Sequence, residues 1–105
     1  MALTVVRRDG PAAVTLTPQG EVDPDTAPAL EAALDAALDG GAPAPIVVDL
    51  SGVRFLDSAG ISALLRGRRR TVAAGRAFRV TGADDFVAEV LHLTGVWDLL
   101  AGGAP

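Results

Sequence analysis

Residues 47–61 have the sequence VVDLSGVRFLDSAGI, which joins a strand-like run to a helix-like segment. The run Ile46–Leu50 is short, continuously apolar and bounded by turn residues, which predicts a strand buried on both faces. The segment Ser58–Ala74 has helical spacing. We expect Ile61, Leu65 and Val72 to face the core, and Arg66, Arg69 and Arg70 to face solvent. The tetrapeptide Asp57-Ser58-Ala59-Gly60 therefore lies at a helix N-terminus beyond a strand end, where open α/β sheets bind ligands.

The chain before this stretch predicts a hairpin and a first helix. Leu3–Arg8 and Ala13–Thr17 are strand-like and are joined by the turn residues Asp9-Gly10-Pro11. Residues 23–26 (DPDT) have the capping carboxylate, the early proline and the acidic first turn that begin helices. The apolar positions at helical spacing that follow are Ala27, Leu30, Leu34 and Ala37. Gly40-Gly41, followed by Pro43, ends this helix.

The chain after the central helix predicts one more strand and two helical segments. Ala77–Thr81 is strand-like, and Asp84–Leu93 is helix-like. The expected apolar stripe of that helix is Phe86, Val90 and Leu93. Val96–Leu100 predicts a short last helix with Trp97 packed in the core, and the end from about residue 102 is expected to fray.

This order of elements predicts an α/β fold. Because strand–helix–strand connections are parallel and right-handed, the sheet is mixed and mostly parallel, with an antiparallel edge strand. We expect about four to five strands packed with about four helices, in one domain spanning residues 1–105. The segments 20–25, 52–60 and 82–85 all follow carboxyl ends of parallel strands and should meet at one rim. The charged residues expected there are Glu21, Asp23, Asp25, Asp57, Asp84 and Asp85, against Arg54 alone. Such a rim repels free anions and favours a basic protein partner.

Composition excludes several classes of function. The net charge of −4 argues against general nucleic-acid binding, which needs a basic surface. The absence of cysteine removes disulfides, thiolate metal sites and thiol nucleophiles, and fits a cytoplasmic protein. No apolar run approaches the roughly 20 residues of a membrane span, so direct membrane insertion is not expected. No metal-ligand spacing, catalytic carboxylate pair or phosphate loop is present, so we expect neither cofactor nor metal.

Ser58 has three interpretations. It could belong to a plain helix N-cap formed by Asp57 or Ser58. Against this, Ile61 occupies the position where a capping box has Glu or Gln. Gly60 also lowers the stability of the first helical turn, and its presence is easier to explain if something approaches the backbone closely there. A catalytic Ser58 would need His92, the only histidine, which lies well along the third helix. The third interpretation is a contact site, at which something approaches the backbone of the first turn closely.

Two other charged groups have simpler interpretations. The carboxylates Glu31, Asp35 and Asp39 line one face of the first helix and are expected to form a solvated surface. The arginine cluster of the central helix, at positions 66, 68, 69 and 70, is expected to be a solvated face or a partner contact. Neither group predicts catalysis.

The stretch from Val47 to Ile61 resembles the central signature of STAS domains, and specifically of the bacterial anti-sigma factor antagonists. Gly20-Glu21-Val22-Asp23 is similar to the family's Gly-Glu-x-Asp turn, and residues 95–100 (GVWDLL) are similar to its C-terminal segment. Many members have a second Ser or Thr where this chain has Ala59. Ser58 is thus the single hydroxyl at this point of the signature.

The resemblance implies partner switching. Such an antagonist binds an anti-sigma factor that is also a serine kinase, is phosphorylated at the matching serine, here Ser58, and is reset by a serine phosphatase. The chain would then be a substrate with no catalytic residue of its own. The residues expected to contact the partner are Glu21, Asp23, Arg54, Asp57, Ser58, Ala59, Gly60 and Ser62. Two alternatives are a STAS adaptor subunit of a transporter or signalling complex, and a weak nucleotide- or small-ligand-binding domain.

Overall fold

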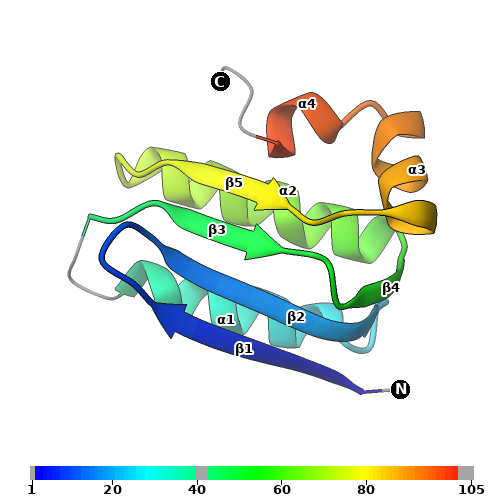
Figure 1. Cartoon of the computed structure of the whole chain (residues 1–105), viewed down its shortest axis with the longest axis horizontal. Helices are drawn as coiled ribbons and strands as arrows, with labels where there is room; N and C mark the ends of the chain where they lie inside the picture. Colours follow the sequence, from blue (N-terminus) through cyan, green and yellow to red (C-terminus); the bar gives the residue numbers. More distant parts are fainter. Residues whose placement is uncertain (1, 40–42, 102–105) are drawn as a thin grey trace.

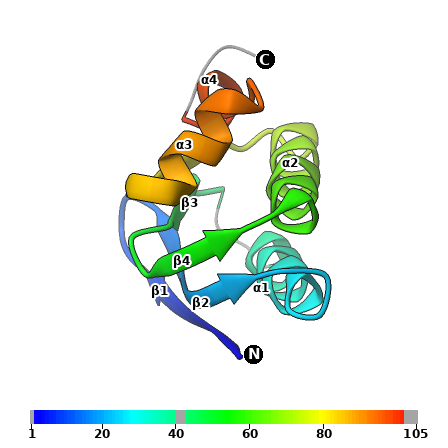
Figure 2. The same ribbon diagram turned by 90° about the vertical axis from the view of Figure 1, so that its right-hand side faces the viewer.

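The computed structural model describes residues 2–39 and 43–101, so the expected fraying from residue 102 lies outside the described residues. Within these residues five strands form one mixed sheet, with β1 antiparallel to β2 and the other pairings parallel, as predicted. The helices α1 and α2 cover one face, and α3 and α4 lie at the end near β4 and β5 (Figures 1 and 2). The elements are β1 Leu3–Asp9, β2 Val14–Val22, α1 Ala27–Asp39, β3 Ile46–Asp49, β4 Val53–Leu56, α2 Ser58–Ala73, β5 Phe78–Thr81, α3 Asp85–Leu93 and α4 Trp97–Leu100.

Strand β2 is longer than predicted and continues beyond Thr17 to Val22. Along residues 14–16 it pairs with β3, and along residues 20–22 it pairs with β4. The N–H groups of Val14 and Gly20 donate toward this same side, so Pro18 falls between the two ladders, where its missing N–H breaks no pairing. The predicted strand ends before Pro18. The observed strand continues because Pro18 lies where β2 changes its partner from β3 to β4.

Strand β4 was not predicted. Its residues Val53 and Leu56 are buried, whereas Arg54 and Phe55 between them are exposed. This pattern lacks the alternation that identifies a half-buried strand from sequence. The strand forms because its backbone pairs with β2, with Glu21 opposite Phe55 and Val22 opposite Leu56. It carries the chain directly into α2.

The helices differ in how well their core faces were predicted. In α1 all four expected residues are buried. In α2 the buried residues are instead Gly60, Ala63, Leu64, Gly67 and Thr71. Ile61 and Leu65 are half-buried against the core, but the expectation for Val72 was wrong, since it is 38% exposed. The reason is close packing: a Cβ on Gly67 would lie 2.7 Å from Cδ1 of Leu34.

The predicted stripe of α3 was also wrong. The residues that enter the core are Val87 and Leu91. Phe86 is 49% exposed and Leu93 is 79% exposed, while Val90 is half-buried. The face that packs is thus rotated by one residue from the face that the spacing predicted. Trp97 is half-buried against the core, and its ring centroid lies 5.1 Å from that of His92.

Charged residues on α1 and α2, expected to be simple solvated faces, contact one another. Arg66 pairs with Glu31 at 3.0 Å, and Arg70 pairs with Asp35. All four side chains are at least one-third exposed, so each pair contributes at most about 1 kcal/mol. Both pairs join α1 to α2 on the solvent side of the two helices.

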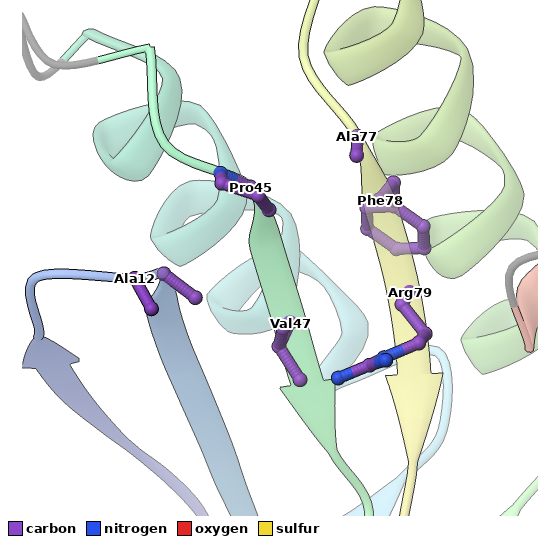
Figure 3. Close-up of a pocket in the computed structure, with 7 residues that line it drawn as sticks. Ala12, Pro45, Val47, Ala77, Phe78 and Arg79 are labelled. Atoms are coloured by element: carbon purple, nitrogen blue, oxygen red, sulfur yellow. The ribbon is translucent and has the colours of Figure 1, made fainter.

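The face of the sheet opposite α1 and α2 has no helix over it in the described part of the chain (Figure 2). The expectation that β3 is buried on both faces was therefore wrong: Ile46 and Val48 are buried, but Val47 is half-buried. An open pocket of about 400 Å³ lies on this sheet, and Figure 3 shows residues that line it. It is lined by Ala12, Ala13, Pro45, Val47, Ala77, Phe78 and Arg79, at the amino ends of β3 and β5. It lies at the opposite end of the strands from the serine-bearing rim.

Candidate functional site

Three loops meet at the carboxyl ends of the parallel strands, as the topology predicted (Figure 2). Backbone hydrogen bonds join them: Gly20 N–H donates to the Gly52 carbonyl at 3.0 Å, and Asp57 N–H donates to the Val22 carbonyl at 3.3 Å. Leu50 N–H donates to the Thr81 carbonyl at 2.8 Å, which ties the third loop to the other two. We call this edge, formed by residues 20–25, 50–60 and 81–87, the carboxyl rim.

Ser58 is the first residue of α2, and Asp57 is its N-cap. Oδ1 of Asp57 accepts the N–H of Ala59 at 2.9 Å and the N–H of Gly60 at 3.4 Å. Ser58 is exposed, and its hydroxyl makes no hydrogen bond with any other described residue. The capping interpretation of the tetrapeptide therefore holds for Asp57 alone. It leaves the Ser58 hydroxyl free for another role.

Removing this cap should destabilise the domain by about 1 kcal/mol, the usual cost of losing an N-cap acceptor. We expect this loss for Asp57→Ala in urea unfolding. Asp57→Asn keeps an oxygen acceptor and should stay within about 0.5 kcal/mol of the wild type. Equal losses in both variants would mean that the negative charge, and not the hydrogen bonds, stabilises the start of α2.

Gly60 is explained by packing inside the domain. A Cβ at this position would lie 2.8 Å from Cγ of Leu56 and 2.9 Å from Cγ1 of Val22. The close approach inferred from the sequence is thus made by two core side chains, not by a ligand. Gly60 is buried, so its part in any partner contact is to let the first turn of α2 sit directly on the ends of β2 and β4.

The loop after β2 is organised around Asp23 and Thr26. Oδ1 of Asp23 accepts the N–H groups of Asp25 at 2.9 Å and Thr26 at 3.0 Å. The Thr26 hydroxyl lies 2.7 Å from the Glu21 carbonyl, to which it donates. The hydrogen bond from the Thr26 N–H, reinforced by that from Asp25, lowers the pKa of Asp23 below its ordinary value of 3.8. Asp23 therefore shapes the loop that follows Glu21 and the end of β2.

This pKa predicts a difference in acid stability between the wild type and Asp23→Asn. A carboxyl group with a lowered pKa in the folded state contributes stability above its unfolded value, near 3.8, and loses it as the pH falls through the folded value. The wild type should therefore lose more stability than Asp23→Asn between about pH 5 and pH 2. Thermal unfolding of both proteins across this range measures the difference. If stability depends on pH in the same way in both proteins, the pKa of Asp23 is not lowered by folding.

The opposite side of the carboxyl rim contains Arg54. A cavity of about 280 Å³ is lined by Ser51, Val53, Arg54, Asp84, Asp85, Phe86 and Val87. Arg54 of β4 thus lines the same cavity as the carboxylates Asp84 and Asp85 at the start of α3. Arg54 is exposed and forms no ion pair with the described residues.

The remaining predicted residues lie around Ser58. Ala59 is half-buried, and the exposed Ser62 follows one helical turn later, on the same face as Ser58. The ring of His92 lies against that of Trp97, with a tilt of 34° between their planes, and His92 makes no hydrogen bond to Ser58, so the geometry offers no Ser–His pair. Among the described residues, no cluster of His, Asp or Glu could hold a metal ion. Likewise, none of the described helices is long and apolar enough to cross a membrane.

Sequence analysis missed one feature of the carboxyl rim. The rings of Phe55 and Phe86 are stacked, with centroids 5.8 Å apart and an angle of 11° between their planes. Both rings are substantially exposed, at 37% and 49%. No local pattern signals this pair, because one ring belongs to the unpredicted β4 and the other was assigned to the core.

The fold and the site together define a small α/β domain that presents a free serine at a helix N-terminus above a mixed sheet. A model of the family described as "Mlab, STAS domain" matches residues 5–101, so the chain belongs to the STAS domain family. A search of curated proteins found no match in sequence.

Solved structures with the same fold include anti-sigma factor antagonists. One from Mycobacterium paratuberculosis is 31% identical, with a TM-score of 0.84 over 99% of this chain and 86% of that chain. The antagonist SpoIIAA in its unphosphorylated form is 21% identical, with a TM-score of 0.73 over 99% of this chain and 89% of that one. The Bacillus cell fate determinant SpoIIAA in its phosphorylated form is 19% identical, with a TM-score of 0.70 over 99% and 92%.

Proposed function

We propose that this chain is an anti-sigma factor antagonist that is switched by phosphorylation of Ser58. The unmodified domain binds an anti-sigma factor serine kinase through the carboxyl rim and so releases a sigma factor. The kinase phosphorylates Ser58, the complex dissociates, and a serine phosphatase restores the unmodified form. The observation that carries the proposal is the exposed Ser58 hydroxyl at the start of α2, free of hydrogen bonds because Asp57 provides the cap. The chain is the substrate in this chemistry.

The domain itself tolerates a phosphate at this position. A phosphoserine carries about −1.5 to −2 charges at neutral pH. At a helix N-terminus, the helix dipole offsets part of the repulsion from the neighbouring Asp57 carboxylate. The exposed position of Ser58 also lets water solvate the phosphate in the free protein. Phosphorylation therefore need not unfold α2.

A complex does not tolerate the phosphate in the same way. The carboxyl rim already carries Glu21, Asp23, Asp25, Asp57, Asp84 and Asp85, with Arg54 as its basic residue among the described side chains. A partner that fits this surface is basic where it meets these carboxylates. Closing such an interface over phosphoserine removes the phosphate from water beside existing negative charges. The switch acts through local charge.

Two comparisons support this proposal. The 31% identical relative is named as an anti-sigma factor antagonist. SpoIIAA has been solved in unphosphorylated and phosphorylated forms, and this chain has similar TM-scores to both, 0.73 and 0.70. Similar folds in the two forms are what a switch without refolding requires.

Binding of Ser58 variants to an anti-sigma factor serine kinase from the same organism tests the proposal. Ser58→Ala should bind as tightly as the wild type and accept no phosphate, whereas Ser58→Glu should bind weakly. Ser62→Ala, one turn along the helix, is the matched control for the phosphorylation assay and should still accept one phosphate at Ser58. Equal, tight binding by the alanine and glutamate variants at position 58 would refute the switch. Co-purification with membrane transport subunits in place of a kinase would favour the adaptor alternative.

A further inference from the structure

Helix α3 has two apolar faces, and the core uses one of them. Val87 and Leu91 are buried beneath the helix. A second line, Phe86, Val90 and Leu93, follows the same helical spacing on the neighbouring face. Phe86 is 49% exposed and Leu93 is 79% exposed. A helix that is apolar on more than one side normally has a second surface packed against it.

The second face of α3 continues onto strand β4. The ring of Phe55 stacks on that of Phe86 with centroids 5.8 Å apart, and Phe55 is itself 37% exposed. Phe55 lies three residues before Ser58, at the strand end that leads into α2. Phe55, Phe86, Val90 and Leu93 therefore form one surface, here called the aromatic patch, which reaches the carboxyl rim. Figure 2 shows α3 lying beside β4 at this end of the domain.

The charges around the aromatic patch indicate what can cover it. Asp84, Asp85 and Glu89, all on or next to α3, are exposed, and Arg54 is the basic side chain that lines the same cavity as Phe86. An apolar surface with more carboxylates than basic groups at its border fits a partner with an apolar pocket bordered mainly by Arg or Lys. A second copy of this chain would bring two acidic borders together, and an anionic membrane surface would repel them. The chemistry favours a basic protein.

We propose that the aromatic patch is the apolar anchor of the same anti-sigma factor kinase that contacts Ser58, an inference that rests on the proposed function. Stacked aromatic rings that become buried at the centre of an interface carry much of its affinity. The patch and the serine then have separate roles. The patch provides most of the binding free energy of the complex, and phosphorylation of Ser58 determines whether the complex forms.

Alanine substitutions on the patch test this division. Phe86→Ala should weaken binding of the purified kinase about thirtyfold, as for a hot-spot residue, and Leu93→Ala by a smaller factor. The concentration of substrate needed for half-maximal phosphorylation of Ser58 should rise in parallel, while the maximal rate stays unchanged. Val72→Ala is the matched control, because Val72 is a 38% exposed apolar residue on α2 outside the patch. It should bind as the wild type. Circular dichroism with thermal unfolding checks that each variant is folded.

The outcomes separate this inference from the proposed function. If both patch variants bind as the wild type while Ser58→Glu still loses binding, the patch is not the anchor and the switch stands. If the wild type itself does not bind the kinase, both proposals fail. Analytical ultracentrifugation of the free protein tests whether a second copy of the chain covers the patch instead. A dimer that Phe86→Ala converts to a monomer would show that the patch mediates self-association and would overturn the inference.

Discussion

Phosphorylated Ser58 is expected to weaken the complex with the anti-sigma factor kinase more than a hundredfold. The phosphate adds about −1.5 to −2 charges next to Asp57, whose Oδ1 already holds the Ala59 N–H at 2.9 Å. In the free domain water solvates the phosphate, but an interface closed over the carboxyl rim removes that water. A penalty of about 3 kcal/mol is enough for this loss, since each 1.4 kcal/mol is a factor of ten. Titration calorimetry with the phosphorylated and unmodified proteins measures it.

A charge placed one turn further along α2 is the control. Ser62→Glu adds a carboxylate on the same helix face but away from the first turn, so its effect should be smaller than that of phosphate on Ser58. The loss should also shrink as salt is raised, because part of it is repulsion between exposed charges. An affinity for phosphorylated protein within threefold of the unmodified value, a factor that corresponds to about 0.6 kcal/mol, would contradict the charge mechanism.

Gly20→Ala is expected to cause the largest loss of stability among the glycine substitutions considered. Gly20 has φ of 127°, a backbone conformation that is essentially restricted to glycine, and a Cβ there would overlap the carbonyl oxygen of Ala2. It also lies at the irregularity where β2 begins to pair with β4. Strain and overlap together should cost about 3 kcal/mol and lower the Tm by roughly 15 °C. Differential scanning calorimetry measures both quantities.

Gly75→Ala separates the two causes. Gly75 also has a positive φ, of 77°, but a Cβ there meets nothing within 4 Å. The substitution should therefore cost only the conformational strain, about 1 to 2 kcal/mol. If Gly20→Ala destabilises the protein no more than Gly75→Ala does, the start of β1 moves to relieve the overlap, and the tight pairing at this corner of the sheet is not required.

The parts of the fold that were predicted correctly are those with a single unambiguous apolar pattern. In helix α1 the large apolar residues are leucines four positions apart, at 30, 34 and 38, and the four predicted core residues from Ala27 to Ala37 are all buried. Helices α2 and α3 have apolar residues on several sides, so spacing alone allows more than one core face. In α2 the choice is made by Gly60 and Gly67, whose lack of a side chain admits Leu56 and Leu34. The spacing of hydrophobic residues does not predict such contacts at glycines.

The site was predictable to the extent that it is local in sequence. The strand–turn–helix order around Asp57 and Ser58 placed the serine correctly, and the topology placed Glu21 and Asp23 on the same rim. The structure was needed to identify Asp57 as the cap and Ser58 as the free hydroxyl, because both residue types cap helices. The stacking of Phe55 on Phe86 joins segments that are far apart in the chain and could not be inferred from local pattern.

Intact mass measurement with phosphopeptide mapping tests the central claim most directly. The protein is incubated with ATP, magnesium and lysate from its own cells, alongside Ser58→Ala and Ser62→Ala. We predict one added phosphate, mapped to Ser58, in the wild type and in Ser62→Ala, and none in Ser58→Ala. Wild-type protein that stays unmodified under these conditions, or a phosphate that maps to Ser62 or elsewhere, would contradict the claim that Ser58 is the switch.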